Sequence, residues 1–516
     1  MSSKDTFRLA LASLHECLQG GASHENCPQH VKSALPTRVL DCLDPEKPRL
    51  IVDVSGIQEP YVALSYVWGE DQPQKTTTDN ISQHINPGLD MDQTPQTIKD
   101  AVRVTHELQL RYLWLDSYCI VQDSADDKVR EIRNMRRIFQ NAYLPIIAAK
   151  TPKVSMGFLH DCPPPLPTFV VPFLCPDGGQ GTMTLSPRAW YNPYEAGKEP
   201  TNSRGWCLEE RILTPRALIY ASHTLQYLCQ RGLLNVGNSF NWAKRTGLDK
   251  LTPRFFSLSA DTTPPYTDTR QELTNLWHQV LQDFTSRGLT APQDRLKAIA
   301  GVAEEFHLRL GSRYVAGLWE HHLLGDLLWT KAGDDPLPRP SVYRAPSWSW
   351  ASIDGIIYNP WPVVEPHEAR CVILDYQVDL THEALPYGAL TGGYLKVKAR
   401  LGKVVWNSSR HHIYGLAPNG EQAVIGGGHP DRLEDVRGDG EQEEVWALPL
   451  VLRPPKQSIF RAREEIQKLA VLAGILLKVH DLHRDCYCRV AYFDFHMTEE
   501  AGRMFEESAE QIVTIL

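Results

Sequence analysis

Two short apolar runs, each followed at once by polar and aromatic residues, constrain the fold of this chain most. Residues 61–66 lead into Val67-Trp68-Gly69, and residues 112–115 lead into Asp116-Ser117-Tyr118-Cys119. Both runs are apolar enough for strands that are covered on both faces. Between them, apolar positions in residues 98–108 repeat at helical spacing. A strand, a helix and a second strand predict a parallel unit whose ligands bind at the carboxyl ends of the strands.

The same alternation continues on both sides of this unit. Residues 35–41 and 49–52 predict two short strands, Ser124 begins a predicted helix, and residues 144–149 predict a third strand of the series. Residues 218–220 and 225–229 predict a hairpin. We therefore expect an α/β fold with a mostly parallel sheet over residues 48–232, preceded by a helix and a lead-in segment at residues 1–47.

The remainder of the chain changes character twice. Residues 233–335 show helical spacing of apolar residues, and we expect one of their helices at residues 318–329. From residue 336 to residue 516 the pattern favours strands, with a loop at Gly426-Gly427-Gly428. A helical region followed by a β-rich C-terminal module is the expected order.

Composition excludes several classes of protein. A chain of 516 residues with 42% hydrophobic and 22% charged residues is typical of globular protein with more than one core. Its net charge of -9 opposes nonspecific binding to nucleic acid, so no nucleic-acid partner is expected. No apolar stretch reaches the length of a membrane span, and no leader is recognisable. We expect a cytoplasmic protein whose eleven cysteines are reduced.

Four residues near the N-terminus have the side chains of metal ligands. They are Cys17, His24, Cys27 and His30. Their spacing matches no strong zinc motif, and no second Cys-x-x-Cys pair accompanies them. From the sequence we expect packing roles and no metal site.

Three ordered blocks resemble the fungal heterokaryon-incompatibility (HET) domain family. They are residues 61–69, 112–123 and 204–213, and the resemblance extends over about residues 48–230. It implies a domain distantly similar to TIR domains, with a TIR-like or flavodoxin-like fold, and a role in fungal non-self recognition that ends in cell death. The family's third block usually reads Gln-Glu where this chain has Glu209-Glu210, so Glu210 is retained.

The resemblance to TIR domains implies cleavage of the glycosidic bond of NAD, which would be a substrate and not a resident cofactor. Glu210 would then stabilise the positive charge that develops on the ribose, and Trp68 or Trp206 would stack on the leaving base. The other residues expected to line this site are Tyr66, Gly69, Ser117, Tyr118, Gln122 and Arg211.

A second interpretation makes Cys119 a nucleophile, because it follows a strand end and lies near Asp116 in sequence. It requires a histidine from elsewhere, and His106, His223 and His321 are the candidates. A small buried thiol that only packs at the strand end is the commoner explanation for such a cysteine.

Two further interpretations concern the whole chain. The HET fold could serve secondary metabolism, with Glu210 or Asp116 as the acid or base of a cyclisation or isomerisation in a pocket that includes Trp348 and Trp350. Alternatively, the chain could be a non-catalytic module that acts through self-association or a protein partner.

Overall fold

The computed structural model describes residues 1–21, 23–30, 32–54, 56–160, 169–176, 178–185, 194–236, 243–244, 251, 255, 267–333, 337–416, 422–454, 470–497, 505 and 508–516. The chain divides into two compact units, Met1–Ser257 and Leu258–Leu516. The predicted boundary between residues 335 and 336 lies outside the described residues.

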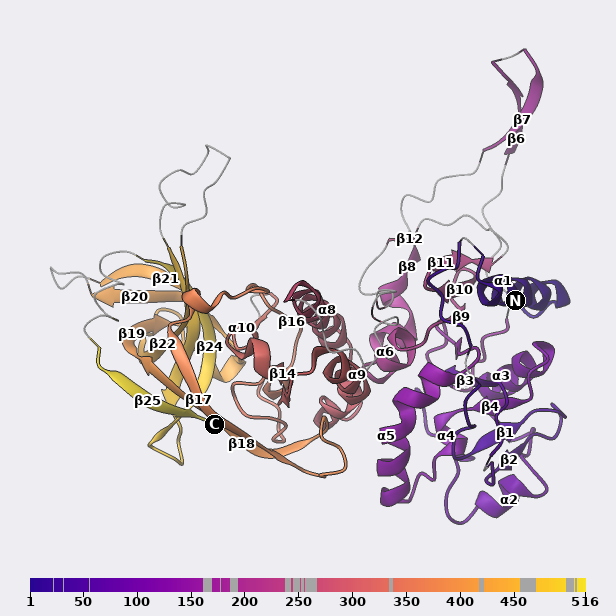
Figure 1. Ribbon diagram of the computed structural model, residues 1–516, viewed down its shortest axis with the longest axis horizontal. Coiled ribbons are helices and arrows are strands. Elements are labelled where there is room, and N and C mark those ends of the chain that lie inside the picture. Colours follow the sequence, from indigo (N-terminus) through magenta and orange to yellow (C-terminus); the bar gives the residue numbers. More distant parts are fainter. Residues whose placement is uncertain are drawn as a thin grey trace. The chain divides into compact units, whose positions relative to one another are not determined.

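The first unit is built on an eight-stranded sheet with the order β11-β10-β9-β5-β3-β4-β1-β2 (Figure 1). Its strands are β1 (Val39–Asp41), β2 (Arg49–Ile51), β3 (Tyr61–Ser65), β4 (Tyr112–Trp114), β5 (Ile146–Ile147), β9 (Ala217–Tyr220), β10 (Leu225–Cys229) and β11 (Gly232–Asn235). The four central strands, β4, β3, β5 and β9, are parallel, and the outer strands pair antiparallel. This arrangement confirms the predicted α/β class with a sheet that is parallel at its centre.

Six α-helices of the described residues accompany this sheet. They are α1 (Lys4–Gln19), α2 (Ile81–Ile85), α3 (Gln96–Glu107), α4 (Asp116–Cys119), α5 (Ala125–Asn141) and α6 (Trp206–Ile212). Local sequence explains where two of them begin. The Ser3 hydroxyl accepts the backbone N–H of Thr6 at 3.2 Å, and the Ser124 hydroxyl accepts that of Asp127 at 3.3 Å. Each serine satisfies a backbone donor that the first turn of a helix would otherwise leave unpaired.

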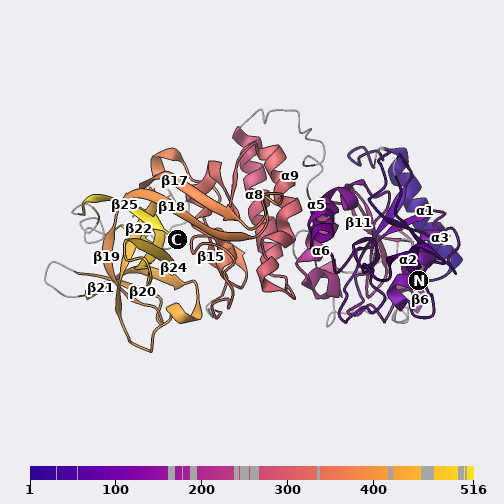
Figure 2. The ribbon, with the colours of Figure 1, turned by 90° about the horizontal axis from the view of Figure 1, so that it is seen from below.

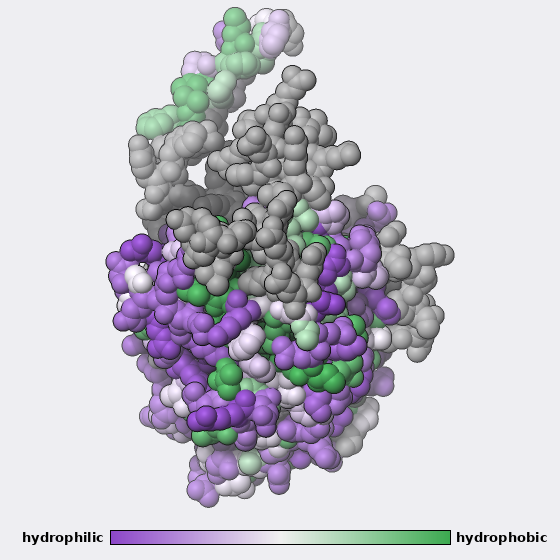
Figure 3. All heavy atoms as spheres, turned by 90° about the vertical axis from the view of Figure 1, so that its left-hand side faces the viewer, coloured by the Kyte–Doolittle hydropathy of each residue, from purple (hydrophilic) through white to green (hydrophobic). Residues whose placement is uncertain are grey.

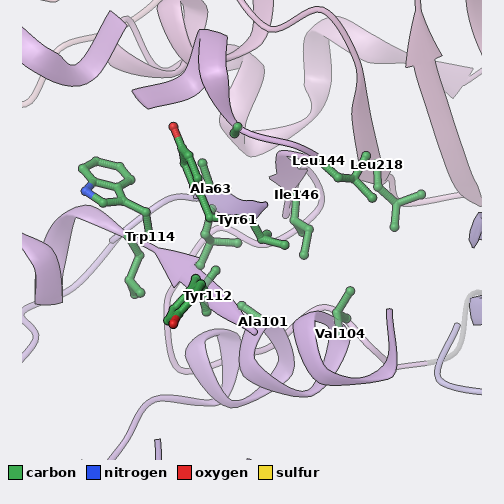
Figure 4. Packing of buried hydrophobic residues seen from close by; sticks show 14 of the residues in the cluster. Tyr61, Ala63, Ala101, Val104, Tyr112, Trp114, Leu144, Ile146 and Leu218 are labelled. Atoms are coloured by element: carbon green, nitrogen blue, oxygen red, sulfur yellow. The ribbon is translucent and has the colours of Figure 1, made fainter. Parts of the chain in front are cut away.

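Apolar side chains from the central strands and from α3 form the core of this unit. Figure 4 shows Ala63 of β3, Trp114 of β4 and Ile146 of β5 in the same cluster as Ala101 and Val104 of α3. Strands that are apolar on both faces therefore lie between covering layers, as their nearly continuous hydrophobic runs predict. The unit also contains the hairpin β6 (Phe169–Leu174) and β7 (Gln180–Leu185) and the pair β8 (Tyr194–Glu195) and β12 (Ala243–Lys244).

The second unit combines helices with a large sheet. Helices α8 (Thr267–Thr285) and α9 (Ala300–Leu310) lie side by side, as Figures 1 and 2 show. The other short elements are α10 (Leu323–Asp326), β13 (Tyr314–Val315), β14 (Leu318–Trp319), β15 (Thr330–Lys331) and β16 (Ile357–Tyr358). The sheet contains β17 (Cys371–Leu380), β18 (Leu390–Arg400), β19 (Gly402–Asn407), β20 (His412–Leu416), β21 (Gln422–Pro430), β22 (Glu443–Arg453), β23 (Val471–Val479), β24 (Cys486–His496) and β25 (Glu510–Ile515).

This second sheet closes on itself. Its order is β17-β18-β25-β24-β21-β20-β19-β22-β23, and β24 also pairs with β23. Six strands, from β24 through β21, β20, β19 and β22 to β23, therefore form a closed ring. The β-rich C-terminal module expected from the sequence is confirmed.

Two local predictions in the second unit were wrong. Residues 318–329 are not one helix, because Ala316 (φ 51°) and Gly317 (φ 97°) form a tight turn that pairs β14 with β13. Gly426 and Gly428 lie inside β21 and not in a loop. A Cβ atom at Gly426 would lie 2.1 Å from the Cβ of Phe495, so these glycines permit close approach between strands.

Most apolar residues lie inside the molecule and not on its surface. On the face seen in Figure 3, hydrophilic residues predominate and hydrophobic residues form small separate groups. Several of the largest apolar side chains, among them Trp277, Trp319, Trp348, Trp350 and Trp406, are fully buried. Within the described residues, no helix is both long enough and apolar enough to cross a membrane.

Candidate functional site

The chain leaves β3 through a turn that only glycine fits. Gly69 has a φ of 66°, and a Cβ atom there would lie 2.0 Å from the carbonyl oxygen of Pro152. This close approach allows the backbone N–H of Val154 to donate to the carbonyl of Trp68 at 3.0 Å. The turn therefore fixes the Trp68 indole beside the neighbouring strand end.

Side chains join the ends of β3 and β4. Asp116 begins α4 soon after β4, and its Oδ2 accepts the indole N–H of Trp68 at 2.9 Å. Its Oδ1 accepts the backbone N–H of Ser117 at 2.7 Å. The Tyr66 hydroxyl donates to the Ser117 hydroxyl at 2.8 Å and accepts the amide N–H of Gln72 at 3.1 Å. Because the two strands are parallel, residues 66–68 and 116–117 meet at one edge of the sheet.

Helix α6 adds a second carboxyl group to this edge. The Cys207 thiol lies 3.9 Å from the carbonyl oxygen of Tyr66, which anchors the helix against the exit of β3. Glu210 is buried, and among the described residues its Oε2 has no hydrogen-bond partner. Burial raises the pKa of Glu210 to about 8, and the charge of Asp116 adds to this rise, whereas Ser65 and Arg204 oppose it.

The pKa of Asp116 is raised as well. Burial raises the pKa of Asp116, while hydrogen bonds from Trp68, Tyr66 and Ser117 and the charge of Arg204 lower it. The two carboxyl groups therefore influence each other, and Asp116 holds more donors that favour its charged form. Such a pair holds one proton near neutral pH and releases it as the pH rises, so its charge changes in the range where acid and base catalysis operates.

Three predicted site residues take part in hydrogen bonds that fix the backbone around α4. The Gln122 amide donates to the carbonyls of Asp116 (2.9 Å) and Ile120 (3.3 Å). The carbonyl of Tyr118 accepts the hydroxyl of Thr76 at 2.8 Å, and the Tyr118 ring lies 5.2 Å from the ring of His84. The carbonyl of Cys119 accepts the Nε–H of Arg38 at 2.6 Å.

The Cys119 thiol is fully buried, and burial raises its pKa to about 12. A thiol with this pKa is almost entirely protonated at neutral pH, which disfavours a nucleophilic role. Of the histidines proposed as its partner, His106 is exposed on α3, His223 lies between β9 and β10, and His321 belongs to the second unit.

The remaining predicted residues lie on or near α6. Trp206 is the first residue of α6 and is partly buried. Arg211 is buried, and its guanidinium donates to the side-chain oxygen of Asn202 at 2.6 Å. Trp348 and Trp350, named for the small-molecule interpretation, are buried in the core of the second unit.

Sequence reasoning missed two residues that affect the carboxyl pair, Ser65 and Arg204. Each carried a signal. Ser65 is a polar residue at the end of an apolar run, and Arg204 opens the block that contains Glu210.

A second carboxylate with two imidazoles lies in the other unit. His278 Nε2 and His322 Nδ1 lie 2.8 and 2.9 Å from Asp326 Oδ1, and Oδ2 accepts the backbone N–H of Trp319 at 2.7 Å. Burial opposes ionisation of Asp326, but the hydrogen bonds of the two histidines lower its pKa overall. These groups already bond to one another, so the arrangement is a hydrogen-bonded network that fixes α10 against α8.

Comparison with known proteins shows which family the segment that contains Asp116 and Glu210 matches. Residues 61–210 match the family described as Heterokaryon incompatibility protein (HET). Heterokaryon incompatibility protein 6, OR allele, of Neurospora crassa is 30% identical over 95 residues, which are 17% of this chain and 14% of that relative. This chain therefore aligns with only a small part of the relative's length. No solved structure matches the chain. The matched residues include both strand ends and finish at Glu210, so residues 61–210 of this chain are a HET domain.

Proposed function

We propose that this chain acts in fungal non-self recognition, and that its HET domain does so by hydrolysing the glycosidic bond of NAD. The observation that carries the catalytic part is that Asp116, which begins α4 after β4, and the buried Glu210 of α6 lie close enough for their charges to interact. The match to the HET family and the name of the Neurospora relative support the biological role.

We also propose that the domain has a TIR-like or flavodoxin-like fold. Numbered along the chain, the four parallel strands follow the order second, first, third, fourth. Flavodoxin-like sheets begin with this order and bind ligands where the order reverses, outside the carboxyl ends of the strands. The order reverses at β3. Trp68 follows this strand, and α6, which contains Glu210, packs against it.

In the proposed reaction, water attacks the ribose carbon while the bond to nicotinamide breaks and its electron pair leaves with nicotinamide. Asp116, which Trp68 and Ser117 hold through hydrogen bonds, accepts the proton of the water. Glu210 in its charged form stabilises the positive charge on the ribose. The products are nicotinamide and ADP-ribose.

Nicotinamide release by the purified chain tests this reaction. We expect Glu210→Gln to lower the rate by about 10²- to 10⁴-fold, because the variant cannot carry the stabilising charge. Because burial raises the pKa of Glu210 to about 8, the wild-type rate should rise as the pH increases through this value. Chromatographic measurement of nicotinamide between pH 6 and pH 9 checks both expectations.

Two neighbouring substitutions are matched controls for this experiment. Glu209→Gln changes another buried carboxyl on the same helix, and Cys119→Ala removes the thiol of the competing mechanism. Both variants should keep the wild-type rate. A rate that depends on Cys119 and not on Glu210 would replace the proposed mechanism with thiol catalysis.

Expression in fungal cells separates catalysis from recognition. If hydrolysis causes the response, wild-type protein should arrest growth and Glu210→Gln protein at the same level should not. Arrest by both proteins would instead identify a non-catalytic module that acts through self-association or a protein partner.

A further inference from the structure

Three thiols and one imidazole from distant parts of the first unit form a buried cluster beside β10. Cys17 lies in the last turn of α1, His24 and Cys27 lie in the segment that follows, and Cys229 is the last residue of β10. All four side chains are buried, and their sulfur and nitrogen atoms lie within 4.8 Å of one another. The sequence argument against a metal lacked Cys229, which the fold supplies.

The spacing of these atoms suits a single tetrahedral ion. The Nδ1 atom of His24 lies 3.4 Å from the sulfur of Cys27 and 3.6 Å from the sulfur of Cys229. Zinc bonds of about 2.3 Å to sulfur and about 2.0 Å to nitrogen at a tetrahedral angle imply a nitrogen–sulfur separation of about 3.5 Å. The backbone N–H of Cys27 donates to the carbonyl of His24 at 2.9 Å, and this turn holds the two side chains together.

A buried arginine provides an independent indication of negative charge at this cluster. Arg216 is 1% exposed and its guanidinium donates to the carbonyl of Pro28, but its Nε has no hydrogen-bond partner within the described residues. Its guanidinium lies near Cys17. A buried guanidinium requires a compensating negative charge. Three thiolates, a divalent ion and a neutral imidazole together carry one net negative charge.

The other nitrogen of His24 also has a suitable neighbour. Its Nε2 lies 3.6 Å from Oε1 of Glu16, and the same oxygen lies 3.6 Å from the guanidinium of Arg231. Imidazoles that bind metals through one nitrogen commonly present the other N–H to a carboxylate, which fixes the orientation of the ring. Glu16 is therefore a positioning residue for His24.

We propose that Cys17, His24, Cys27 and Cys229 bind one zinc ion, which joins α1 and the segment after it to the hairpin of β10 and β11. Thiolates and an imidazole are the ligands that zinc prefers, and each thiol releases its proton to solvent when it binds. Four protein ligands leave no position for a substrate, so the ion is structural. The site lies outside the matched residues 61–210 and does not depend on the proposed hydrolysis.

The metal content of the full-length protein, measured by plasma mass spectrometry, is the first test. We expect one zinc ion per chain in the wild-type protein and well below one in Cys229→Ser. Cys42→Ser is the matched control, because Cys42 is fully buried in the same unit but lies outside the cluster, and it should keep its zinc. Zinc retained by Cys229→Ser, or iron in place of zinc, would overturn the proposal.

Cobalt binding by the wild-type protein provides a second test, and this measurement does not depend on whether a variant folds. Wild-type protein, stripped by a chelator and loaded with Co²⁺, should show thiolate charge-transfer absorption and the intense visible bands of tetrahedral cobalt. His24→Cys should still bind cobalt, with shifted bands, because it supplies a fourth thiolate. A wild-type chain that takes up neither metal, or whose cluster cysteines form a disulfide in mass spectrometry, contradicts the assignment.

Discussion

Glu210 shows how removal from water changes the behaviour of one side chain. Its folded-state pKa of about 8 lies above the ordinary value of 4.5, so the folded protein holds a proton that the unfolded chain releases. Between these two values, each unit of pH increase should therefore reduce the free energy of unfolding by about 1.4 kcal/mol. Below the lower value, and above the higher one, Glu210 contributes no slope.

Glu210→Gln isolates this contribution, because glutamine has a similar shape and does not titrate. We expect the variant to become progressively more stable relative to the wild type as the pH rises from about 5 to about 8. Urea denaturation of both proteins at several pH values gives the difference in unfolding free energy. Parallel pH dependences would mean that Glu210 is ionised in the folded protein at neutral pH.

Residues that follow a strand were predictable, whereas residues brought together by the fold were not. Trp68, Asp116 and Ser117 follow two parallel strands, and periodicity alone placed them at one edge. Cys229 is separated from Cys27 by most of the first unit, so no local spacing connects the two. The influence of Arg204 on the carboxyl pair likewise depends on where α6 packs against β3.

At the scale of elements, Arg38 holds the lead-in segment, α4 and α5 together. Its Nε–H donates to the carbonyl at the end of α4, and its Nη2 lies 2.5 Å from Asp127 in the first turn of α5. Glu131 lies 3.6 Å from the same guanidinium. The helix that begins with Asp116 is thus fixed by a residue outside the family match.

Arg38→Met should lower the free energy of unfolding by about 3–5 kcal/mol, because it leaves the buried carboxylates of Asp127 and Glu131 with only the largely exposed Arg130 as an ionic partner. Arg130→Met is the matched control. Arg130 pairs with the same Asp127, but its side chain is 55% exposed, so its loss should cost at most about 1 kcal/mol. Urea denaturation measures both values, and equal losses would show that burial does not strengthen the pair with Arg38.

Most elements of the first unit were predictable because helical and strand periods differ clearly in its sequence. Helix α5, for example, begins after the expected Ser124. The prediction failed at residues 318–329, where apolar residues at helical spacing instead form β14, a 3-10 turn and α10. Pairing with β13 across the turn at Ala316 and Gly317 outweighed helical propensity there.

At the scale of the whole molecule, each unit has its own buried apolar clusters. We therefore expect two transitions in calorimetry of the full chain. Removal of the proposed zinc by a chelator should lower the midpoint of one transition and leave the other unchanged, because all four ligands belong to the first unit. A single transition, or a shift of both, would mean that the units unfold together.

The sheet of the first unit extends beyond the family match on both sides. β1 and β2 precede residue 61, and β9, β10 and β11 follow residue 210. A fragment cut at the limits of the match would therefore expose the backbone of β4 at one border and that of β5 at the other. Unpaired strands of this kind recruit further strands from neighbouring molecules. The family match and the compact unit thus have different limits, and shortened versions of this protein should keep the whole of Met1–Ser257 to avoid aggregation.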